Sequence, residues 1–439
     1  MIIRNITKKV TAAVTAVFIA GTMCLSGCGK KGAVNEADSS GVFKPSLDTQ
    51  KQVSLNIAGF LGNFEALDQV VNSFNEIYPN VTISYETSGG NNKLVEYLKN
   101  NPEVDIFMTT DDSVRNTSDS GVYVGDYCLD LSRENIDFGA IQDNMIESAT
   151  IDGKMLRMPI AQSTSGMVVN KSLLEREGLK VPLNYREFLD VCQALKNKGY
   201  TPIQGSKTHV GSDMVINMAM NRIGNDSGLI NAFGSNSDTA AEGFRDVLSR
   251  CWEIVSRGYT DYELNAQYPD DNYDGAILRF FEGNVPFWIC NAESVSGMKK
   301  RESKSAAYTE NPFEYSFVYV PLGDNGAYEY MEPWYGFSIN KNSGVRDYAV
   351  EFMRFLATNE QINKIAEIKG MPSVAKVSGD KVYSGIHGIE NIAGSYTYKG
   401  LVRNDIKNAV CDVSNGISRG TYADVDQAVN DLSERCMKK

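Results

Sequence analysis

The sequence predicts an α/β fold in which helices cover the faces of a parallel sheet. Segments with the alternating pattern of strands take turns with segments whose apolar residues recur at helical spacing. A strand, helix, strand, helix, strand order with short connections favours parallel strands joined by crossover helices. The chain of 439 residues is long enough for two domains.

The first elements can be assigned directly from these patterns. Asn63 can cap a helix that ends before Pro79. The expected elements are a strand at 53–57, a helix at 64–77, a strand at 81–85, a helix at 92–100 and a strand at 104–108. Ligands of such sheets bind at the carboxyl ends of the strands. The loops at 58–63 and 109–113 therefore form the candidate binding edge.

Later elements are marked by turn and capping residues. Asp152 and Gly153 predict a tight turn, and Asn184 with Glu187 forms a capping box for a helix that stops before Gly199. Further helices are expected at 244–255, 347–356, 361–368 and 425–436, and strands at 315–320 and 337–340. We find no internal repeat.

The N-terminus predicts export and a lipid anchor. A basic segment precedes a short apolar run at 10–25, which fits a signal peptide better than a membrane span of about 20 residues. Leu25–Cys28 resembles the lipobox of bacterial lipoproteins, which implies cleavage before Cys28 and lipidation of its thiol. We expect a signal peptide at 1–27 and, because residues 29–51 lack an apolar pattern, a flexible tether at 28–51.

Charge and cysteine content narrow the class of protein. The net charge is −12, and loss of the signal segment removes three basic and no acidic residues, which argues against nucleic-acid binding. We expect a monomer on the outer face of the cell membrane, held there only by the anchor. Apart from Cys24 and Cys28, six cysteines remain. They lack the spacing of a metal site, and no disulfide pairing among them can be selected.

Several segments, taken in order, resemble extracellular solute-binding proteins of the maltose-binding type. No single segment is specific, but the order and the spacing are. The segments lie at 104–107, 159–160, 166–171, 177–188, 199–202, 281–287, 333–341 and 370–373. The resemblance covers the chain from about Val53 to the C-terminus.

This resemblance implies a two-lobed type II fold in which strands cross between the lobes and act as hinges. Lobe 1 would comprise 52–162 and 335–371, and lobe 2 would comprise 163–334 and 372–439. The implied function is capture of a mono- or oligosaccharide for an ABC transporter, whose permease subunits would be the protein partners. We expect no cofactor and no metal.

Candidate ligand residues lie at the binding edge of lobe 1. Sugars are held by carboxylates and amides that bond hydroxyl pairs and by aromatic rings that cover their faces. Asp111 and Asp112 follow the strand after which the family places polar sugar ligands, although an aspartate there can also cap a helix. Phe60, Asn63 and Glu65 follow the first strand, where Phe60 can instead pack beneath the loop.

Other candidates lie near the expected hinge. Gln162 precedes Ser163 and Thr164, which are polar where a core strand would be apolar. Trp334, with its neighbour Tyr335, resembles the aromatic residue that relatives direct at the sugar. Trp288, near Asn291 and Glu293, is a second possible stacking platform. Core packing is the alternative for both tryptophans, and Trp252 is expected in the core.

The sequence gives no support for an enzyme. His209 and His387 are the only histidines, and the motifs of zinc proteases, serine hydrolases and phosphate-binding loops are absent. A glycosidase with two carboxylates needs no histidine and remains the alternative enzyme class. A binder of a non-sugar solute, such as a peptide or a polyol, or a sensory subunit would also be consistent with this sequence.

Overall fold

The computed structural model describes residues 43–61, 64–90, 93–115, 123–205, 210–233, 235–268, 273–377, 392–398 and 404–437. Residues 42–439 form one compact unit. The predicted signal peptide, Cys28 and Asn63 lie outside the described residues. Among the described residues, none of the helices is both long and apolar enough to cross a lipid bilayer.

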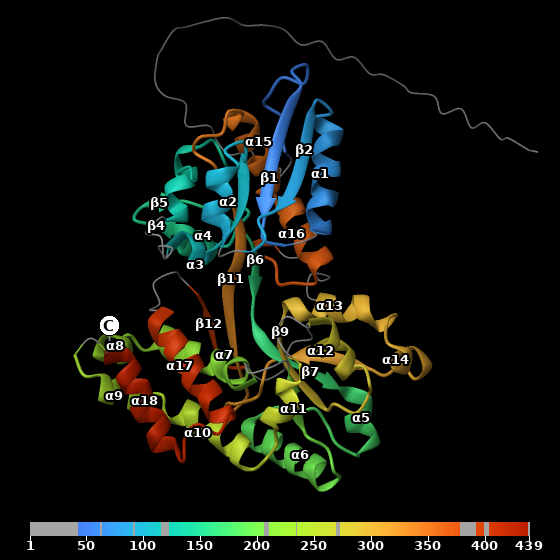
Figure 1. The fold of residues 1–439 in the computed structure, drawn as a ribbon, viewed down its shortest axis with the longest axis vertical. Helices are drawn as coiled ribbons and strands as arrows, with labels where there is room; N and C mark the ends of the chain where they lie inside the picture. The colour runs from blue at the N-terminus through green and yellow to red at the C-terminus, as the bar shows by residue number, and fades with distance from the viewer. Residues whose placement is uncertain are drawn as a thin grey trace, which may run out of the picture. The chain divides into compact units, whose positions relative to one another are not determined.

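The first sheet confirms the predicted parallel arrangement. β1 pairs in parallel with β2 on one side and with β3 on the other (Figure 1). Helices α1 and α2 provide the crossovers. The bounds are β1 Val53–Gly59, α1 Glu65–Ile77, β2 Val81–Thr87, α2 Leu94–Asn100 and β3 Ile106–Thr110. The predicted elements are thus present, with ends displaced by one or two residues.

Two further strands, β11 and β6, add to this sheet through antiparallel pairing and continue beyond it. β11 (Ala327–Ile339) pairs with β3 at its end and with β6 (Met158–Ser163) along its middle. Its beginning pairs in parallel with β12 (Ile392–Thr397). Gly336 allows β6 to approach, since a Cβ there would lie 2.1 Å from the carbonyl oxygen of Met158.

The second sheet begins immediately after β6. Only Thr164 separates β6 from β7 (Ser165–Asn170), so the chain passes between the sheets at the predicted crossing. The strand order is β10-β7-β9-β8, antiparallel except for the last pair. The other bounds are β8 Ile203–Gly205, β9 Phe287–Asn291 and β10 Tyr315–Val318.

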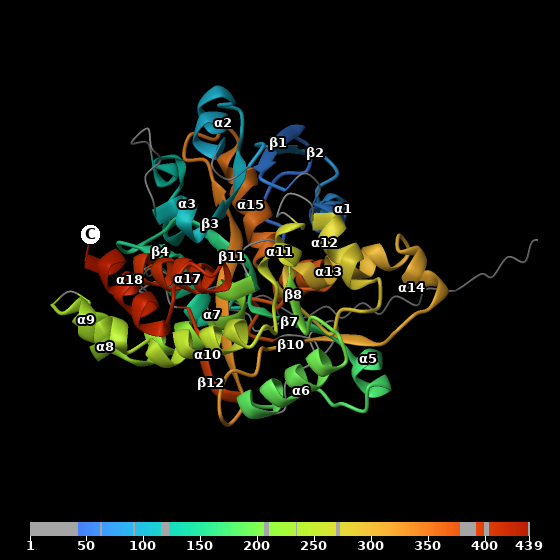
Figure 2. The ribbon, with the colours of Figure 1, turned by 60° about the horizontal axis from the view of Figure 1, so that its bottom comes forward.

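Four helices pack together behind the second sheet: α7 Val210–Asn225, α10 Arg245–Ser256, α17 Asn404–Ser418 and α18 Val425–Met437 (Figure 2). α7 is buried along most of its length and contacts α17, β11 and β7. It nevertheless carries Asn217 and Asn221, whose side-chain amides donate to the backbone carbonyls of Ser165 and Glu329. The sequence analysis missed α7 because apolar and buried polar residues are mixed along it, so no separate apolar stripe marks the helix.

The remaining elements are shorter helices and one hairpin. Asp152 and Gly153 both have positive φ, at 50° and 76°, and form the predicted turn of the hairpin. The elements are α3 Asp111–Arg115, α4 Asp143–Ala149, β4 Thr150–Ile151, β5 Lys154–Met155, α5 Lys171–Arg176, α6 Tyr185–Asn197, α8 Ser227–Ala232, α9 Ser237–Glu242, α11 Tyr262–Ala266, α12 Tyr273–Phe280, α13 Glu293–Glu302, α14 Ala306–Glu310, α15 Arg346–Leu356 and α16 Asn359–Lys369.

Each sheet has an apolar cluster on both faces. In β3, Ile106 and Met108 enter the large cluster of the first sheet, and Phe107 enters the smaller one. In β9, Phe287 enters the large cluster of the second sheet, and Trp288 the smaller one. We call the two large clusters the first core and the second core. Alternation along each strand therefore accounts for a helical layer on both faces.

Two predicted boundaries need correction. Residues 43–51 are not part of a free tether, because Phe43 stacks edge-on against Phe355 at 5.2 Å and Ser46 donates to the carboxylate of Glu351. Val374 and Ala375 lie in the first core, beyond the boundary predicted at residue 371. These two segments, residues 43–51 and 374–375, are held in place by partners that lie far away in the sequence.

Candidate functional site

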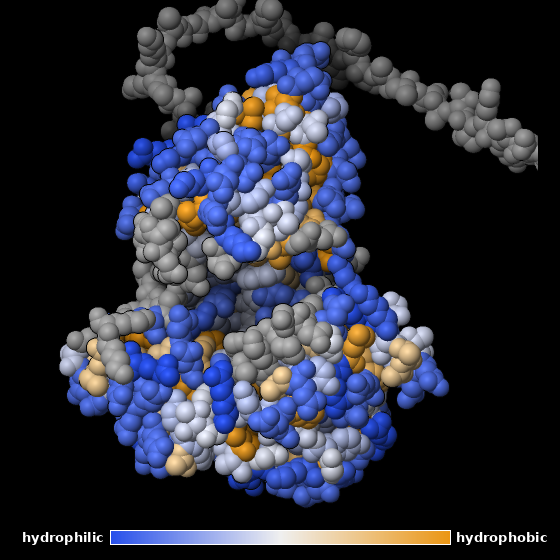
Figure 3. All heavy atoms as spheres, in the orientation of Figure 1, coloured by the Kyte–Doolittle hydropathy of each residue, from blue (hydrophilic) through white to orange (hydrophobic). Residues whose placement is uncertain are grey.

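The candidate site lies where β6 and β11 cross between the two sheets. In the register of this pair, Ser163 lies opposite Glu332 and Gln162 opposite Pro333. Figure 3 shows the surface hollowed near this level, between two predominantly hydrophilic regions. Of the residues in this register, Glu332 is partly exposed, whereas Gln162 and Ser163 are buried at the crossing.

Trp334 has no partner in β6 because the register shifts between Pro333 and Tyr335. Such an irregularity redirects a side chain from the regular pleat. The Trp334 ring is partly exposed and meets the Tyr335 ring edge-on at 4.7 Å. A partly exposed indole held from one side by a second ring can present a flat apolar face to a solute.

Tyr335 supports Trp334 from the interior. It is fully buried in the first core and stacks edge-on against Phe64 at 5.7 Å. Its hydroxyl has no hydrogen-bond partner among the described atoms, and burial raises the pKa of Tyr335 well above the ordinary value. The ligand contact predicted for Tyr335 is contradicted, because its side chain has no exposed surface and its ring packs against that of Trp334.

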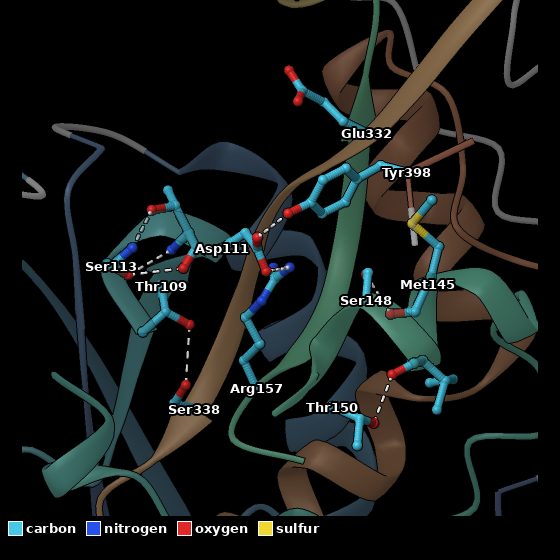
Figure 4. A network of polar contacts seen from close by, with 12 residues as sticks. Thr109, Asp111, Ser113, Met145, Ser148, Thr150, Arg157, Glu332, Ser338 and Tyr398 are labelled. Atoms are coloured by element: carbon cyan, nitrogen blue, oxygen red, sulfur yellow. Dashed lines mark hydrogen bonds and ion pairs between the residues drawn. The ribbon is translucent and has the colours of Figure 1, made fainter. Parts of the chain in front are cut away.

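Asp111 is the centre of a buried polar network (Figure 4). Arg157 lies 3.2 Å from its Oδ1 atom, and the hydroxyl of Tyr398 donates to Oδ2 at 2.9 Å. The Arg157 side chain is 0% exposed and that of Asp111 11% exposed. Asp111 thus begins α3 at the predicted edge, but its carboxylate is already bound by two protein donors. The side chain of Asp112 lies outside the described residues.

Glu293 lies at the start of α13 and faces the crossing. Its carboxylate accepts a hydrogen bond of 2.6 Å from Ser163, the last residue of β6. Burial, with smaller contributions from the charges of Glu332 and Asp213, raises the pKa of Glu293 to about 7, although the hydrogen bond from Ser163 acts to lower it. A carboxyl with such a pKa can both donate to and accept from hydroxyl groups near neutral pH.

Glu65 forms an ion pair across the crossing with Lys300 of α13, at 2.7 Å. Its hydrogen bond and charge interaction with Lys300 lower the pKa of Glu65. Lys369, at the end of α16, lies over the Phe64 ring at 5.7 Å. Burial lowers the pKa of Lys369, and repulsion by Lys300 lowers it further.

A second ion pair lies on the β11 side of the crossing. Lys407 of α17 pairs with Glu332, which also accepts a 2.7 Å hydrogen bond from Tyr330. The Tyr330 ring stacks on that of Tyr396 in β12, with centroids 6.0 Å apart.

A cavity of about 610 Å³ lies beside β12. This volume is within the range of small-molecule sites, roughly 300 to 1,000 Å³. Its lining residues are Asn144, Ile223, Gly224, Asn225, Ser227, Ile230, Asn231, Ser395, Tyr396 and Thr397.

Of four other predicted residues, Trp288 and Gln162 are buried, whereas Asn291 and Phe60 keep exposed surface and stay predictions. Trp288 is 2% exposed and meets Tyr268 edge-on within the smaller cluster of the second sheet, so it offers no stacking face. Gln162 is buried and donates to the carbonyl of Ser373 at 2.6 Å. Asn291 is exposed but accepts from Ser294 at the start of α13. Phe60 is partly buried against the first core.

The sequence analysis missed five residues that contact the predicted ones in this polar group: Arg157, Lys300, Lys369, Tyr398 and Lys407. None lies in a recognisable motif, and each meets its partner only through the tertiary fold. The one signal in the sequence was the presence of carboxylates at the crossing, which require cationic or hydroxyl partners when buried.

The fold and the crossing strands define a two-lobed α/β binding protein of type II. The chain belongs to the bacterial extracellular solute-binding protein family, whose model matches residues 69–384. The comparison with curated protein sequences finds no match.

Solved structures show the same fold at low sequence identity. A protein of Caldanaerobius polysaccharolyticus studied for xylan utilization is 18% identical, with a TM-score of 0.64 over 87% of this chain and 99% of that one. The cyclic α-maltosyl-1,6-maltose binding protein of Arthrobacter globiformis is 16% identical, with a TM-score of 0.63 over 88% and 98%. The sugar-binding protein MalE of Xanthomonas citri is also 16% identical, with a TM-score of 0.63 over 88% and 96%.

Proposed function

We propose that this protein binds a carbohydrate at the crossing of β6 and β11 and delivers it to an ABC importer. The observation that carries the proposal is the partly exposed Trp334, held by buried Tyr335 in the same short segment as Glu332. Because the paired Ser163 bonds Glu293, an apolar ring and hydroxyl-binding carboxyls occur together. This combination suits the C–H faces and hydroxyl groups of a sugar.

Further support comes from the relatives, since the named neighbours include proteins that bind maltosyl and other sugars. The family consists of binding proteins rather than enzymes. The crossing strands would act as hinges, so that a bound sugar stabilises a closed state. A thioether-linked lipid on Cys28 would hold the protein at the outer face of the cell membrane, with the segment before Phe43 as the tether.

The test is isothermal titration with a panel of neutral mono- and oligosaccharides, peptides and polyols. Trp334→Ala is expected to weaken the binding of the best sugar about tenfold or more, equivalent to about 1.4 kcal/mol. Trp252→Ala is the matched control, because Trp252 packs beside the second core on α10 and should leave sugar affinity unchanged. Unaltered affinity of the Trp334 variant, or binding of peptides alone, would contradict the proposal.

A further inference from the structure

Lys369 has a fixed position at the crossing. It is the last residue of α16, and Gly370 ends that helix in the left-handed conformation, with a φ of 60°. The chain then returns to β6, where the carbonyl oxygen of Ser373 accepts a 2.6 Å hydrogen bond from Gln162. The end of α16 is therefore attached to the hinge strand, and this attachment holds Lys369 beside it.

The ammonium of Lys369 shares an aromatic support with Trp334. It lies 5.7 Å from the centroid of the Phe64 ring. The Phe64 ring meets that of Tyr335 with centroids 5.7 Å apart, and Tyr335 meets the indole of Trp334 at 4.7 Å. A row of contacting rings thus connects the cation to the proposed stacking surface, so both belong to one site.

Lys369 retains its donors for a solute. In the part of the chain that the structure describes, its ammonium has neither an ion pair nor a hydrogen bond, and the side chain is only partly buried. Burial and the charge of Lys300 lower the pKa of Lys369, whereas the charges of Glu65 and Glu293 raise it. The last turn of a helix also favours a cation. An anion that binds here would replace the water that burial has removed from the ammonium.

The ion pair beside Lys369 leaves a positive excess. Lys300 of α13 donates to Glu65 at 2.7 Å, and each of these two side chains is 52% exposed. Lys300 and Lys369 therefore share one carboxylate between two ammonium groups. Because an ammonium has three donors, Lys300 can keep its bond to Glu65 and still donate to a second acceptor.

Glu293 does not cancel this excess near neutral pH. Burial is the main reason why the pKa of Glu293 is raised to about 7, so much of this carboxyl is protonated there. A protonated carboxyl can donate a hydrogen bond to a carboxylate. The described groups around Lys369 thus offer about one net positive charge, which suits a carboxylate better than a phosphate with nearly two negative charges.

We infer that the solute is a carbohydrate that contains a uronic acid, whose carboxylate binds to Lys369 and Lys300. The inference rests on the proposed function and specifies its substrate class. In a uronate, the carboxylate is attached to the same ring whose C–H face can stack on Trp334. Hydrogen bonds from an ammonium to a carboxylate are about twice as strong as those between neutral groups. One carboxylate held by α16 and α13 would also join the two sides of the crossing.

The experiment is isothermal titration of the whole protein with matched acidic and neutral probes. Digalacturonate is paired with its dimethyl ester, and xylotriose with a glucuronic acid branch is paired with plain xylotriose. We expect both members of a pair to bind, and the acid to bind about tenfold more tightly or better. Raising the salt concentration from about 0.02 M to about 0.5 M should reduce this preference, because ions screen the attraction.

Maltotriose and galactose 6-phosphate complete the set of probes. A neutral partner that binds as well as its acid in both pairs would overturn the inference and leave carbohydrate binding intact. Tighter binding of maltotriose or of the sugar phosphate than of either uronate would have the same meaning. Binding of a peptide or a polyol alone would overturn the proposed function as well.

Substitutions of Lys369 test whether its charge causes the preference. Lys369→Met removes the charge but keeps an unbranched side chain over Phe64, and the preference for the acid should fall about tenfold. Lys369→Arg should retain most of it, because the positive charge remains. Lys364→Met is the control on the same helix, since Lys364 bonds Ser73 of α1 at 2.8 Å. An unaltered preference in the folded Lys369→Met protein would overturn the inference.

Discussion

The hydroxyl of Tyr398 donates a 2.9 Å hydrogen bond to Asp111, a residue 287 positions earlier in the chain. Tyr398 belongs to the second core, whereas Asp111 follows β3 of the first sheet. Arg157, which precedes β6, holds the other carboxylate oxygen. One carboxylate therefore joins a segment after the first sheet to a residue of the second core.

Replacing Arg157 should destabilise the protein severely. Arg157→Met leaves the Asp111 carboxylate without its cation in a buried place, and the expected loss is about 3 to 5 kcal/mol. Chemical denaturation followed by circular dichroism measures it. The double variant Arg157→Met with Asp111→Asn should recover part of this loss, because the neutral amide needs no counter-ion. Equal losses in both variants would show that the charge of Asp111 is not the cause.

The periodic part of the fold could be predicted from the sequence, and the crossing strand only in part. α1 and α6 show a clear apolar stripe, which yielded their positions within two residues. Only the end of β11 was predicted, because Pro333 lacks an amide hydrogen and polar residues precede it. The pairing with β6 tolerates the proline at a register shift, a feature that depends on the partner strand.

The site was predictable to the extent that it lies at strand ends. Topology places Asp111 directly after β3, Glu65 at the start of α1 and Trp334 within β11, and their part in a sugar site stays a prediction. Their partners could not be predicted, because Lys300 meets Glu65 across 235 residues of sequence. Trp288 and Trp334 look alike in the sequence, and only the pleat of β9 decides that Trp288 is buried.

The three tryptophans allow an optical test of the site. Trp334 lies at the crossing beside the first core, Trp252 lies on α10 beside the second core, and Trp288 is buried in the smaller cluster of the second sheet. A sugar that covers the indole of Trp334 should change its emission. We expect Trp334→Phe to lose most of the sugar-induced fluorescence change, while Trp252→Phe retains it. A full signal from the Trp334 variant would place the responding residue elsewhere.

Glu351 should make the stability depend on pH in the acidic range. Burial alone would raise the pKa of Glu351, but hydrogen bonds from Ser46 and Tyr78, with that from Arg354, produce a net lowering. A lowered pKa in the folded state stabilises the protein above the ordinary value of 4.5, and this contribution is lost as the pH falls through the folded pKa. The wild-type melting temperature should therefore fall steeply below about pH 4.5.

Glu351→Gln is the variant that isolates this contribution. It should cost about 1.5 to 3 kcal/mol at pH 7, typical of hydrogen bonds to a charged group, and should flatten the acid dependence. The same substitution also tests the docking of residues 43–51, because Ser46 loses its charged acceptor and proteolysis before Leu47 should accelerate. Parallel pH curves for the variant and the wild type would contradict this account.

Glu293 should make the stability depend on pH in the opposite direction from Glu351, and at a pH nearer to neutral. Burial raises the pKa of Glu293 to about 7, above its ordinary value of 4.5, so the folded protein favours the protonated carboxyl. The associated stability is fully present below about pH 4.5 and is lost as the pH rises through 7. Glu293→Gln removes the titration, and its stability relative to the wild type should increase by about 1 to 3 kcal/mol between pH 5 and pH 8.

The control for Glu293 lies on the same helix. Glu302→Gln alters the ion pair with Lys299 and the hydrogen bond from Tyr315, and should change stability by a similar amount from pH 5 to pH 8. Melting temperatures of the three proteins, measured without sugar from pH 5 to pH 8, give the comparison. If the Glu293 and Glu302 variants follow the wild-type curve alike, Glu293 is ionised throughout, and its Ser163 contact cannot offer a sugar hydroxyl both a donor and an acceptor near neutral pH.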